Sequence, residues 1–169
     1  MIHIRRATPD DAQAISSLLV TLTREHIAAD CTDGGLDQLL GIMTVDSVRE
    51  RMAGNFSTWI ATDNGVLAGV CVLRLPAHLY HLFVATGFQK QGLGRRLLET
   101  AVQRCRKNAA TAPVSALTVN ASSFGLPAYL RLGFSLDGPR KEENGIRFQP
   151  MRLGLGLGLG LGPTAKDTC

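Results

Sequence analysis

Two glycines, one residue apart, stand where a short apolar run gives way to a leucine-rich stretch. The segment VATGFQKQGLGRRLLETAVQRC covers residues 84–105 and contains them as Gly92 and Gly94. The first amides of a helix have no partner within the helix, and together with the helix dipole they attract anions. Because glycine has no Cβ, these amides would be open to a pyrophosphate. The segment therefore predicts a site for a phosphate-bearing ligand.

Positive charge surrounds the two glycines. Between residues 89 and 107 the one acidic residue is Glu99, and the basic residues are Lys90, Arg95, Arg96, Arg104, Arg106 and Lys107. A positive local field favours an anionic ligand. The spacing excludes two classes of phosphate site, because Leu97 stands where the dinucleotide fingerprint needs a third glycine and the P-loop pattern is absent.

Helices before this segment are predicted from cap residues and apolar spacing. Thr8 is a cap residue, Pro9 suits a first turn, and the two aspartates that follow stabilise a helix start. The apolar face of this first helix consists of Ile15, Leu18, Leu19 and Leu22. A loop is expected over residues 31–42 and a second helix over residues 45–53.

Strands dominate the remainder. A short strand is predicted at residues 2–7, and a hairpin turns at Asn64-Gly65, a pair that tolerates positive φ angles. After Gly92 the period becomes helical, with an apolar stripe of Leu93, Leu97, Leu98, Ala101, Val102 and Cys105. Further strands are expected at residues 78–84, 114–120, 133–138 and 145–153, with a short helix at 124–132. The fold class is α+β (α/β by some schemes), with a mixed, mostly antiparallel sheet.

The length, composition and net charge of the chain fit one globular domain that binds small anionic ligands. The chain has 169 residues, 45% of them hydrophobic, and a net charge of +4. With 5% aromatic residues and no known module, nucleic acid is not an expected partner. No apolar run approaches the roughly 20 residues of a membrane span. The start MIHIRRATPDDAQ turns acidic where an export signal turns apolar, which favours a cytoplasmic location.

The four cysteines are expected to be reduced and mostly buried, because Cys31, Cys71, Cys105 and Cys169 show no CxxC spacing. No metal site is predicted. The folded domain is expected over residues 1–153, and the Leu-Gly tail over residues 154–169 is expected to be disordered.

Two blocks carry a family resemblance. VATGFQKQGLGRRLL resembles motif A of the GCN5-related N-acetyltransferases (GNAT), in which a strand ends at Val84 and Q-x-x-G-x-G opens a helix. LTVNASSFGLPAYLRLGF resembles motif B, with Asn120 ending a strand and Tyr129 in a short helix. Together with HLFV and NGIRFQPMRL, the blocks resemble an uncharacterised bacterial subgroup over residues 1 to about 153.

The resemblance implies the GNAT-like acyl-CoA N-acyltransferase fold and acetyl-coenzyme A (acetyl-CoA) as cosubstrate. The activity it implies is direct transfer of an acetyl group, in a ternary complex, to a primary amine of a small molecule or peptide. Homodimers are common in the family. The implied cofactor contacts, some at splayed strands, are Leu82, Phe83, Val84, Gln89, Lys90, Gln91, Gly92, Leu93, Gly94, Arg95, Asn120 and Tyr129.

By resemblance Tyr129 serves the departing thiolate and the Val84 amide serves the oxyanion. Unperturbed pKa values of about 10 for tyrosine and about 8.5 for a thiol make full proton transfer uphill by roughly 2 kcal/mol. A hydrogen bond to the thiolate and outright donation therefore both stand as roles for Tyr129. Asn120 either contacts the cofactor arm or an ordered water, or caps a turn.

The candidates for the general base that deprotonates the amine are the two histidines of the segment HLYHLFV, residues 78–84. Many members of the family carry a glutamate in this strand, and this sequence has none there. Regular alternation places His78 on the face of Leu82 and Val84, and His81 on the other with Leu79. On that basis one histidine at most faces the site, and His78 is favoured. Such a base predicts an inflection of kcat/KM between about pH 6 and 8.

Two other functions stay open alongside catalysis. The missing glutamate is compatible with a non-catalytic sensor that binds acetyl-CoA, and the basic helix alone would suit nucleic acid. The acceptor is expected to meet residues 23–43, where Asp30, Asp33 and Asp37 are candidates to attract a cationic amine. The identity of the acceptor does not follow from the sequence.

Overall fold

A single mixed sheet organises the chain. The computed structural model describes residues 1–108 and 114–156. In this part of the chain the strands follow the order β1-β2-β3-β4-β5-β8-β6, and β7 pairs with β8. Every neighbouring pair is antiparallel except β4 and β5. The strands are β1 (Ile2–Arg6), β2 (Phe56–Asp63), β3 (Val66–Arg74), β4 (His78–Val84), β5 (Ala116–Ala121), β6 (Ser135–Leu136), β7 (Lys141–Glu143) and β8 (Ile146–Gly154).

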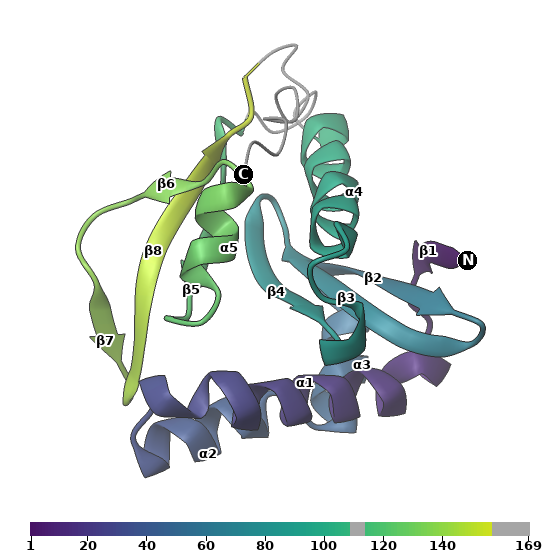
Figure 1. Ribbon diagram of the computed structural model, residues 1–169, viewed down its shortest axis with the longest axis horizontal. Helices are drawn as coiled ribbons and strands as arrows, with labels where there is room; N and C mark the ends of the chain where they lie inside the picture. Colours follow the sequence, from purple (N-terminus) through teal and green to yellow (C-terminus); the bar gives the residue numbers. More distant parts are fainter. Residues whose placement is uncertain (109–113, 157–169) are drawn as a thin grey trace.

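Helices lie on both faces of this sheet. Helices α4 and α5 pack on one face, while α1, α2 and α3 lie across the other (Figure 1). The helices are α1 (Ala12–His26), α2 (Asp33–Gly41), α3 (Val45–Ala53), α4 (Leu93–Asn108) and α5 (Leu126–Arg131). Short 3₁₀ turns precede α1 (Pro9–Asp11), follow it (Ala28–Asp30) and follow β4 (Thr86–Phe88). The predicted fold class is confirmed.

The apolar stripes of the sequence become two cores, one on each face of the sheet. Every member of the predicted α4 stripe is buried, and the stripe packs with Leu117 of β5 and Met151 of β8. On the other face Ile15 and Leu19 of α1 pack against Val70 of β3. The helical periodicity of the sequence therefore predicted the buried faces of α1 and α4, although Leu18 of α1 is only half-buried.

Most of the predicted loop over residues 31–42 is the helix α2 (Asp33–Gly41), so that prediction was wrong. Thr32 caps α2 by accepting a hydrogen bond from the Gly35 amide at 3.1 Å. The Thr32 amide donates in turn to the Gly145 carbonyl at 2.8 Å, and Gly35 lies against that same peptide. Paired glycines disfavour a helix locally. Here a cap and a tertiary contact made 113 residues away outweigh that preference.

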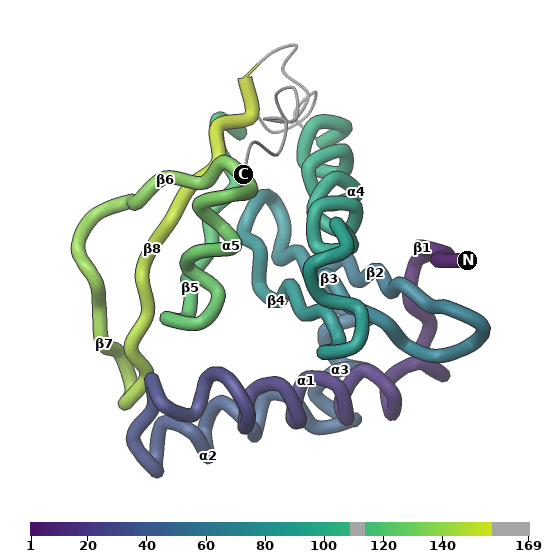
Figure 2. The backbone as a smooth tube through the Cα atoms, in the orientation of Figure 1, coloured from purple at the N-terminus to yellow at the C-terminus, as the bar shows by residue number. Residues whose placement is uncertain are grey.

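The turn predictions are confirmed with one addition. Asn64 and Gly65 adopt φ angles of 48° and 82° between β2 and β3. Asn144 and Gly145 turn in the same way, but they join β8 to the short strand β7, which the sequence did not indicate. The tip of this second hairpin lies beside the α1–α2 junction (Figure 2), where Cys31 pairs with Ile146.

The thiol prediction is confirmed for Cys71 and Cys105, which are free and buried, whereas Cys31 is free and half-buried. Burial raises the pKa of Cys105 to about 11, so this thiol is protonated and unreactive at neutral pH. Strand β8 ends at Gly154, and the predicted disorder of the tail, with Cys169, falls mostly on residues outside those described. Within the described ranges no helix combines the length and apolarity that crossing a membrane requires.

Candidate active site

A gap opens in the sheet between β4 and β5. These parallel strands pair only where His78 lies opposite Thr118 and Leu79 lies opposite Val119. Beyond Leu79, β4 remains paired with β3 on its other side as far as Val84. The edge of β4 that faces β5 therefore presents backbone groups that no strand occupies. An extended ligand can hydrogen-bond to such an edge as an additional strand would.

The gap begins at an irregularity in β4. His81 pairs with Val72 and Leu79 pairs with Leu73, so the intervening Tyr80 has no residue opposite and forms a bulge. Leu79 consequently packs with the α4 cluster, whereas His81 makes edge contacts with Tyr80 and Phe83. The predicted alternation, which grouped Leu79 with His81, was wrong.

One cavity of about 610 Å³ collects most of the predicted site. His78 and His81 both line it, which the bulge allows and a regular strand would not. Of the other predicted residues, Gln91 and Arg95 are not part of its wall. The predicted residues that do line it are Leu82, Phe83, Val84, Gln89, Lys90, Gly92, Leu93, Gly94, Asn120 and Tyr129.

The glycine segment forms the end of the cavity where α4 begins. Gly92 has a φ of +77°, and the first backbone bond into the helix runs from the Arg96 amide to the Gly92 carbonyl at 3.2 Å. The preceding amides have no intrahelical acceptor. A Cβ at Gly92 would meet no atom within 4 Å, and one at Gly94 would meet only Val84, at 3.8 Å. The space in front of these amides is open, as an anion site requires.

Gln89 fastens this loop to the end of β4. Its side-chain amide donates to the Val84 carbonyl at 3.0 Å. The Ala85 amide donates to Ala68 in β3, so alternation along the strand directs the Val84 amide to the opposite side, toward the gap. Its side chain therefore positions the strand end, while the cofactor contact that the sequence assigned to Gln89 stays a prediction.

Tyr129 reaches the cavity from α5, the short helix after β5. Its ring lies edge-on to Phe134, with ring centroids 5.2 Å apart. A Cβ at Gly125 would stand 3.3 Å from this ring, so glycine there lets the ring lie close to the preceding loop. Burial, with the nearby Cys71 thiol as the smaller cause, raises the pKa of Tyr129 above its ordinary value. The hydroxyl is therefore a hydrogen-bond donor at any physiological pH.

The two histidines differ in their surroundings. His78 is half-buried, and its Nδ1 lies 2.8 Å from the Thr118 hydroxyl, which leaves Nε2 for another partner. Burial, and then the charge of Arg74, lowers the pKa of His78. His81 is only 7% exposed, and burial together with Arg51 lowers its pKa to about 3. Both rings are neutral at pH 7, and the lowered pKa of His78 moves any inflection from this ring below its ordinary value, toward the acidic end of the predicted window.

Asn120 lies exposed near the end of β5, where it lines the cavity opposite Pro150 of β8. No side-chain hydrogen bond of Asn120 is recorded among the described residues. This position does not distinguish a ligand contact from a turn cap, so both roles remain predictions.

The segment over residues 23–43, which the sequence assigned to the acceptor, contributes to the second wall of the cavity. The sequence did not predict that this wall is apolar. Apolar side chains from α1, α2 and their surroundings line it: Leu22, Ile27, Leu39, Ile42 and Met43. Phe148 of β8 joins them, and Phe124 stacks on His26 with centroids 3.9 Å apart and planes at 5°. The apolar spacing of α1 did predict burial of Leu22, but nothing in the sequence brings β8 or Phe124 to this wall.

The aspartates proposed to attract an amine do not line the cavity. Asp30 is 5% exposed and accepts hydrogen bonds from the Ser123 amide at 2.7 Å and from Arg140 at 3.0 Å. It ties the end of α1 to the loop after β5. The one acidic side chain in the wall of the cavity, within the described residues, is Glu143.

The match to a family model decides the affiliation of the chain. Residues 27–155 match the model described as an acetyltransferase (GNAT) domain, which is more than half of the sequence. The chain belongs to the GNAT acetyltransferases. This confirms the resemblance drawn from motifs A and B, without fixing a subgroup, and it makes the protein an acetyl-CoA-dependent acetyltransferase.

Solved structures share the GNAT fold. A GCN5-related N-acetyltransferase from Rhodopseudomonas palustris is 22% identical, with 90% of this chain and 94% of that chain covered and a TM-score of 0.71. PaiA N-acetyltransferase from Thermoplasma acidophilum, solved with coenzyme A, is 15% identical, with coverage of 91% and 99% and a TM-score of 0.73. YncA of Salmonella typhimurium, a putative acetyltransferase solved with acetyl-CoA, is 20% identical, with coverage of 98% and 99% and a TM-score of 0.64. No curated protein matches this GNAT chain in sequence.

Proposed function

We propose that this GNAT protein transfers the acetyl group of acetyl-CoA to the neutral primary amine of a small molecule or peptide, by direct attack in a ternary complex. The observation that carries the proposal is the cavity between β4 and β5. It joins an unpaired strand edge, an open helix N-terminus and the Tyr129 ring in one space. An acyl carrier with a diphosphate and an extended amide-bearing arm fits these features.

The binding roles follow from the geometry. The amides around Gly92 and Gly94 would hold the diphosphate, because neither glycine carries a side chain into that space. The gap-facing edge of Leu82–Val84 would hydrogen-bond to the pantetheine arm. The Val84 amide, directed into the gap, is our candidate donor to the oxyanion. A donor already in place stabilises charge that develops in the transition state.

We assign His78 as the group that accepts a proton from the attacking amine. Direct removal of a proton from an ammonium of pKa about 10 by a histidine below 6.5 is uphill by about 5 kcal/mol or more. The amine must therefore enter neutral. Once its nitrogen bonds to the carbonyl carbon it becomes positively charged and acidic. Nε2 of His78 then accepts that proton directly or through water, since Nδ1 already faces Thr118.

Tyr129 completes the step at sulfur. As the carbon–sulfur bond breaks, the electron pair remains on sulfur and the Tyr129 hydroxyl donates a hydrogen bond to it. The raised pKa of Tyr129 makes full proton transfer less favourable than ordinary pKa values suggest. Of the two roles left open by the sequence, the hydrogen bond is the better supported, and the thiolate then takes its proton from solvent.

The cavity wall formed by α1, α2 and β8 suggests the class of acceptor. Most of its side chains are apolar or aromatic, with Arg147 of β8 as a cation and Glu143 as the only carboxylate in the described wall. Burial of apolar surface favours ligands by roughly 25 cal/mol per Å². We therefore propose an amine that carries an apolar or aromatic body, in preference to a polyamine.

The test is thiol release from acetyl-CoA with a panel of amines, with the product identified by mass spectrometry. Phenethylamine and apolar amino-acid amides are expected to turn over with higher kcat/KM than spermidine. The pH profile of kcat/KM should show a limb below about pH 6.5 that is absent in His78→Gln. Binding of acetyl-CoA without turnover of any amine would contradict catalysis and favour the sensor function.

A further inference from the structure

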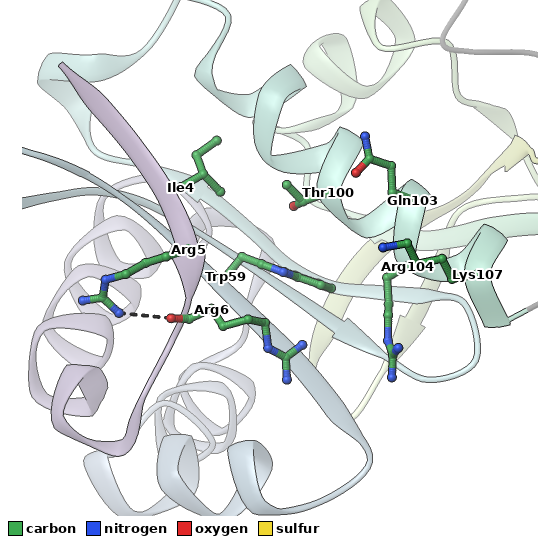
Figure 3. Close-up of a pocket in the computed structure, with 8 residues that line it drawn as sticks. All are labelled: Ile4, Arg5, Arg6, Trp59, Thr100, Gln103, Arg104 and Lys107. Atoms are coloured by element: carbon green, nitrogen blue, oxygen red, sulfur yellow. Dashed lines mark hydrogen bonds between the residues drawn. The ribbon is translucent and has the colours of Figure 1, made fainter.

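A second cavity of about 590 Å³ lies on the far side of α4 from the gap. It is formed where β1 and β2 face the second half of that helix (Figure 3). None of its wall residues is shared with the cavity between β4 and β5. From Gly94 to Arg104 a helix rises about 15 Å, so the two cavities lie at different positions along α4. The proposed acetyl transfer makes no use of this second cavity.

One face of α4 supplies half of the wall. Thr100, Gln103, Arg104 and Lys107 follow the spacing i, i+3, i+4, i+7, which places them on a single side of a helix. The buried stripe of α4 occupies a different side. In the sequence, Arg104 and Lys107 indicated only a general positive field. In the structure both line this one cavity.

The sheet supplies a third cation and an aromatic floor. Arg6 lies directly opposite Trp59 in the β1–β2 ladder, so both side chains project from the same face. The Arg6 guanidinium stands 5.2 Å from the centre of the Trp59 ring. Trp59 is 9% exposed and closes the bottom of the cavity.

Arg5 also lines the cavity, but an ion pair with Asp11 neutralises its charge. It projects to the opposite side of β1 from Arg6 (Figure 3), and there it pairs with Asp11 at 2.8 Å. By contrast, no ion pair of Arg6, Arg104 or Lys107 is recorded within residues 1–108 and 114–156. No carboxylate from these described ranges lines the cavity either. Three positive charges therefore converge without a neutralising partner among the described residues.

The Nε of Arg104 is an independent indication of a binding site in this cavity. This atom is buried and has no hydrogen-bond partner among the described residues. A buried donor without a partner is costly and uncommon in folded proteins. Arginine guanidinium groups present forked N–H donors that match the oxygens of phosphate groups.

We propose that this second cavity binds a small polyanion that carries a diphosphate or triphosphate group. Arg6, Arg104 and Lys107 neutralise the phosphates, and Gln103 and Thr100 offer further polar contacts. The Trp59 ring forms the floor beneath the ligand. This site is separate from the acetyl-CoA cavity and does not depend on the proposed acetyl transfer.

Trp59 reports on the site directly, because it is the only tryptophan in the chain. The experiment titrates tripolyphosphate into the full chain at low ionic strength, with acetyl-CoA present at saturation. Binding is followed by calorimetry and by Trp59 emission. We expect saturable binding with a change in emission, and weaker binding of orthophosphate than of tripolyphosphate.

Three single substitutions on α4 and β1 locate the site. Arg104→Gln, Lys107→Gln and Arg6→Gln should each weaken tripolyphosphate binding by about 10-fold or more, the effect of losing one charge-assisted hydrogen bond. Arg106→Gln removes the same charge from the same helix outside the cavity, and it should change the affinity by less than about twofold. Thermal midpoints close to wild type would show that each variant is folded.

Three outcomes would overturn the proposal. The first is no heat of binding for tripolyphosphate with the wild-type chain. The second is an equal loss of affinity in Arg106→Gln, which would indicate a diffuse charge effect. The third is binding of tripolyphosphate that occurs only in the absence of acetyl-CoA, which would place the anion in the cavity between β4 and β5 instead.

Discussion

The two walls of the cavity between β4 and β5 are built in different ways. The wall proposed to bind the cofactor, called the cofactor wall, comes from one nearly continuous stretch, the end of β4 and the start of α4, and it would act through backbone amides. The wall proposed to bind the amine, called the acceptor wall, comes from α1, α2, β8 and the loop before α5, and it would act mainly through apolar side chains. A hydrogen bond between Thr32 and Gly145, 113 residues apart, holds part of it together.

This difference in construction suggests that the cofactor wall is suited to a ligand shared by the whole family, whereas the acceptor wall is suited to an amine particular to this protein. A backbone site tolerates many side chains around its glycines, so the cofactor wall suits a ligand common to the whole family. The acceptor wall depends on each side chain and on the docking of the β7–β8 hairpin. We therefore expect changes in one wall to leave binding at the other largely unaffected.

The largest effect is expected from Tyr129→Phe, at the boundary between the two walls. Loss of the hydroxyl removes the donor to the leaving sulfur, and kcat should fall by about 10²- to 10⁴-fold. The Kd for acetyl-CoA, measured by calorimetry, should stay within about twofold. Tyr80→Phe, the matched change at the other tyrosine of the cavity, should keep most of kcat. An equal fall in both variants would remove the special role of Tyr129.

Gly92→Val should damage the cofactor wall alone. A β-branched residue at a φ of +77° is strained by about 1–3 kcal/mol, and its side chain enters the space in front of the amides. We expect the Kd for acetyl-CoA to rise by about 10- to 100-fold, while the apparent KM for the amine stays nearly constant. Gly87→Ala is the control, because an added Cβ there meets nothing within 4 Å and φ is not positive. Unchanged acetyl-CoA affinity in Gly92→Val would contradict the assignment of this loop.

His81 makes the fold of β4 sensitive to acid. Its pKa is about 3 in the folded chain against 6.5 in the unfolded chain, so the unfolded state binds the proton first as pH falls. Stability is full above about pH 6.5 and declines toward pH 3, with a loss of about 2 kcal/mol between pH 7 and 5. In His81→Phe, whose ring suits the contacts with Tyr80 and Phe83, urea unfolding should show a smaller loss over that range. Identical losses in both proteins would exclude His81 as the source.

The smallest effect is expected at the acceptor wall. Phe124→Ala removes the ring that stacks on His26, and the KM for an aromatic amine should rise by about fivefold. The Kd for acetyl-CoA should not change. Leu130→Ala is the matched control, since Leu130 is exposed on α5 and does not line the cavity. A rise in the Kd for acetyl-CoA instead of the KM would show that the two walls are not separate.

Local signals in the sequence predicted the cofactor side well. The α4 stripe, the Asn64-Gly65 turn and the open position of Gly92 each depend on a few neighbouring residues, and each is present in the structure. The family motifs then pointed to Tyr129, which does line the cavity. Its role as donor stays a prediction.

What the sequence could not predict depends on distant contacts. The helix over Asp33–Gly41 forms because Thr32 and Gly35 meet Gly145, and no local pattern contains that contact. The bulge at Tyr80 brings both histidines to one cavity, against the regular alternation that the sequence suggests. The pKa of His81 likewise follows from burial and from Arg51, which lies on a different element.

Hydrogen–deuterium exchange of the full chain, with and without acetyl-CoA, would show which of the two walls the cofactor covers. We predict that acetyl-CoA slows exchange in residues 82–96, the end of β4 and the glycine loop, and leaves residues 27–43 unchanged until an amine is added. Slower exchange in residues 27–43 with acetyl-CoA alone, and none in residues 82–96, would contradict the assignment of the two walls.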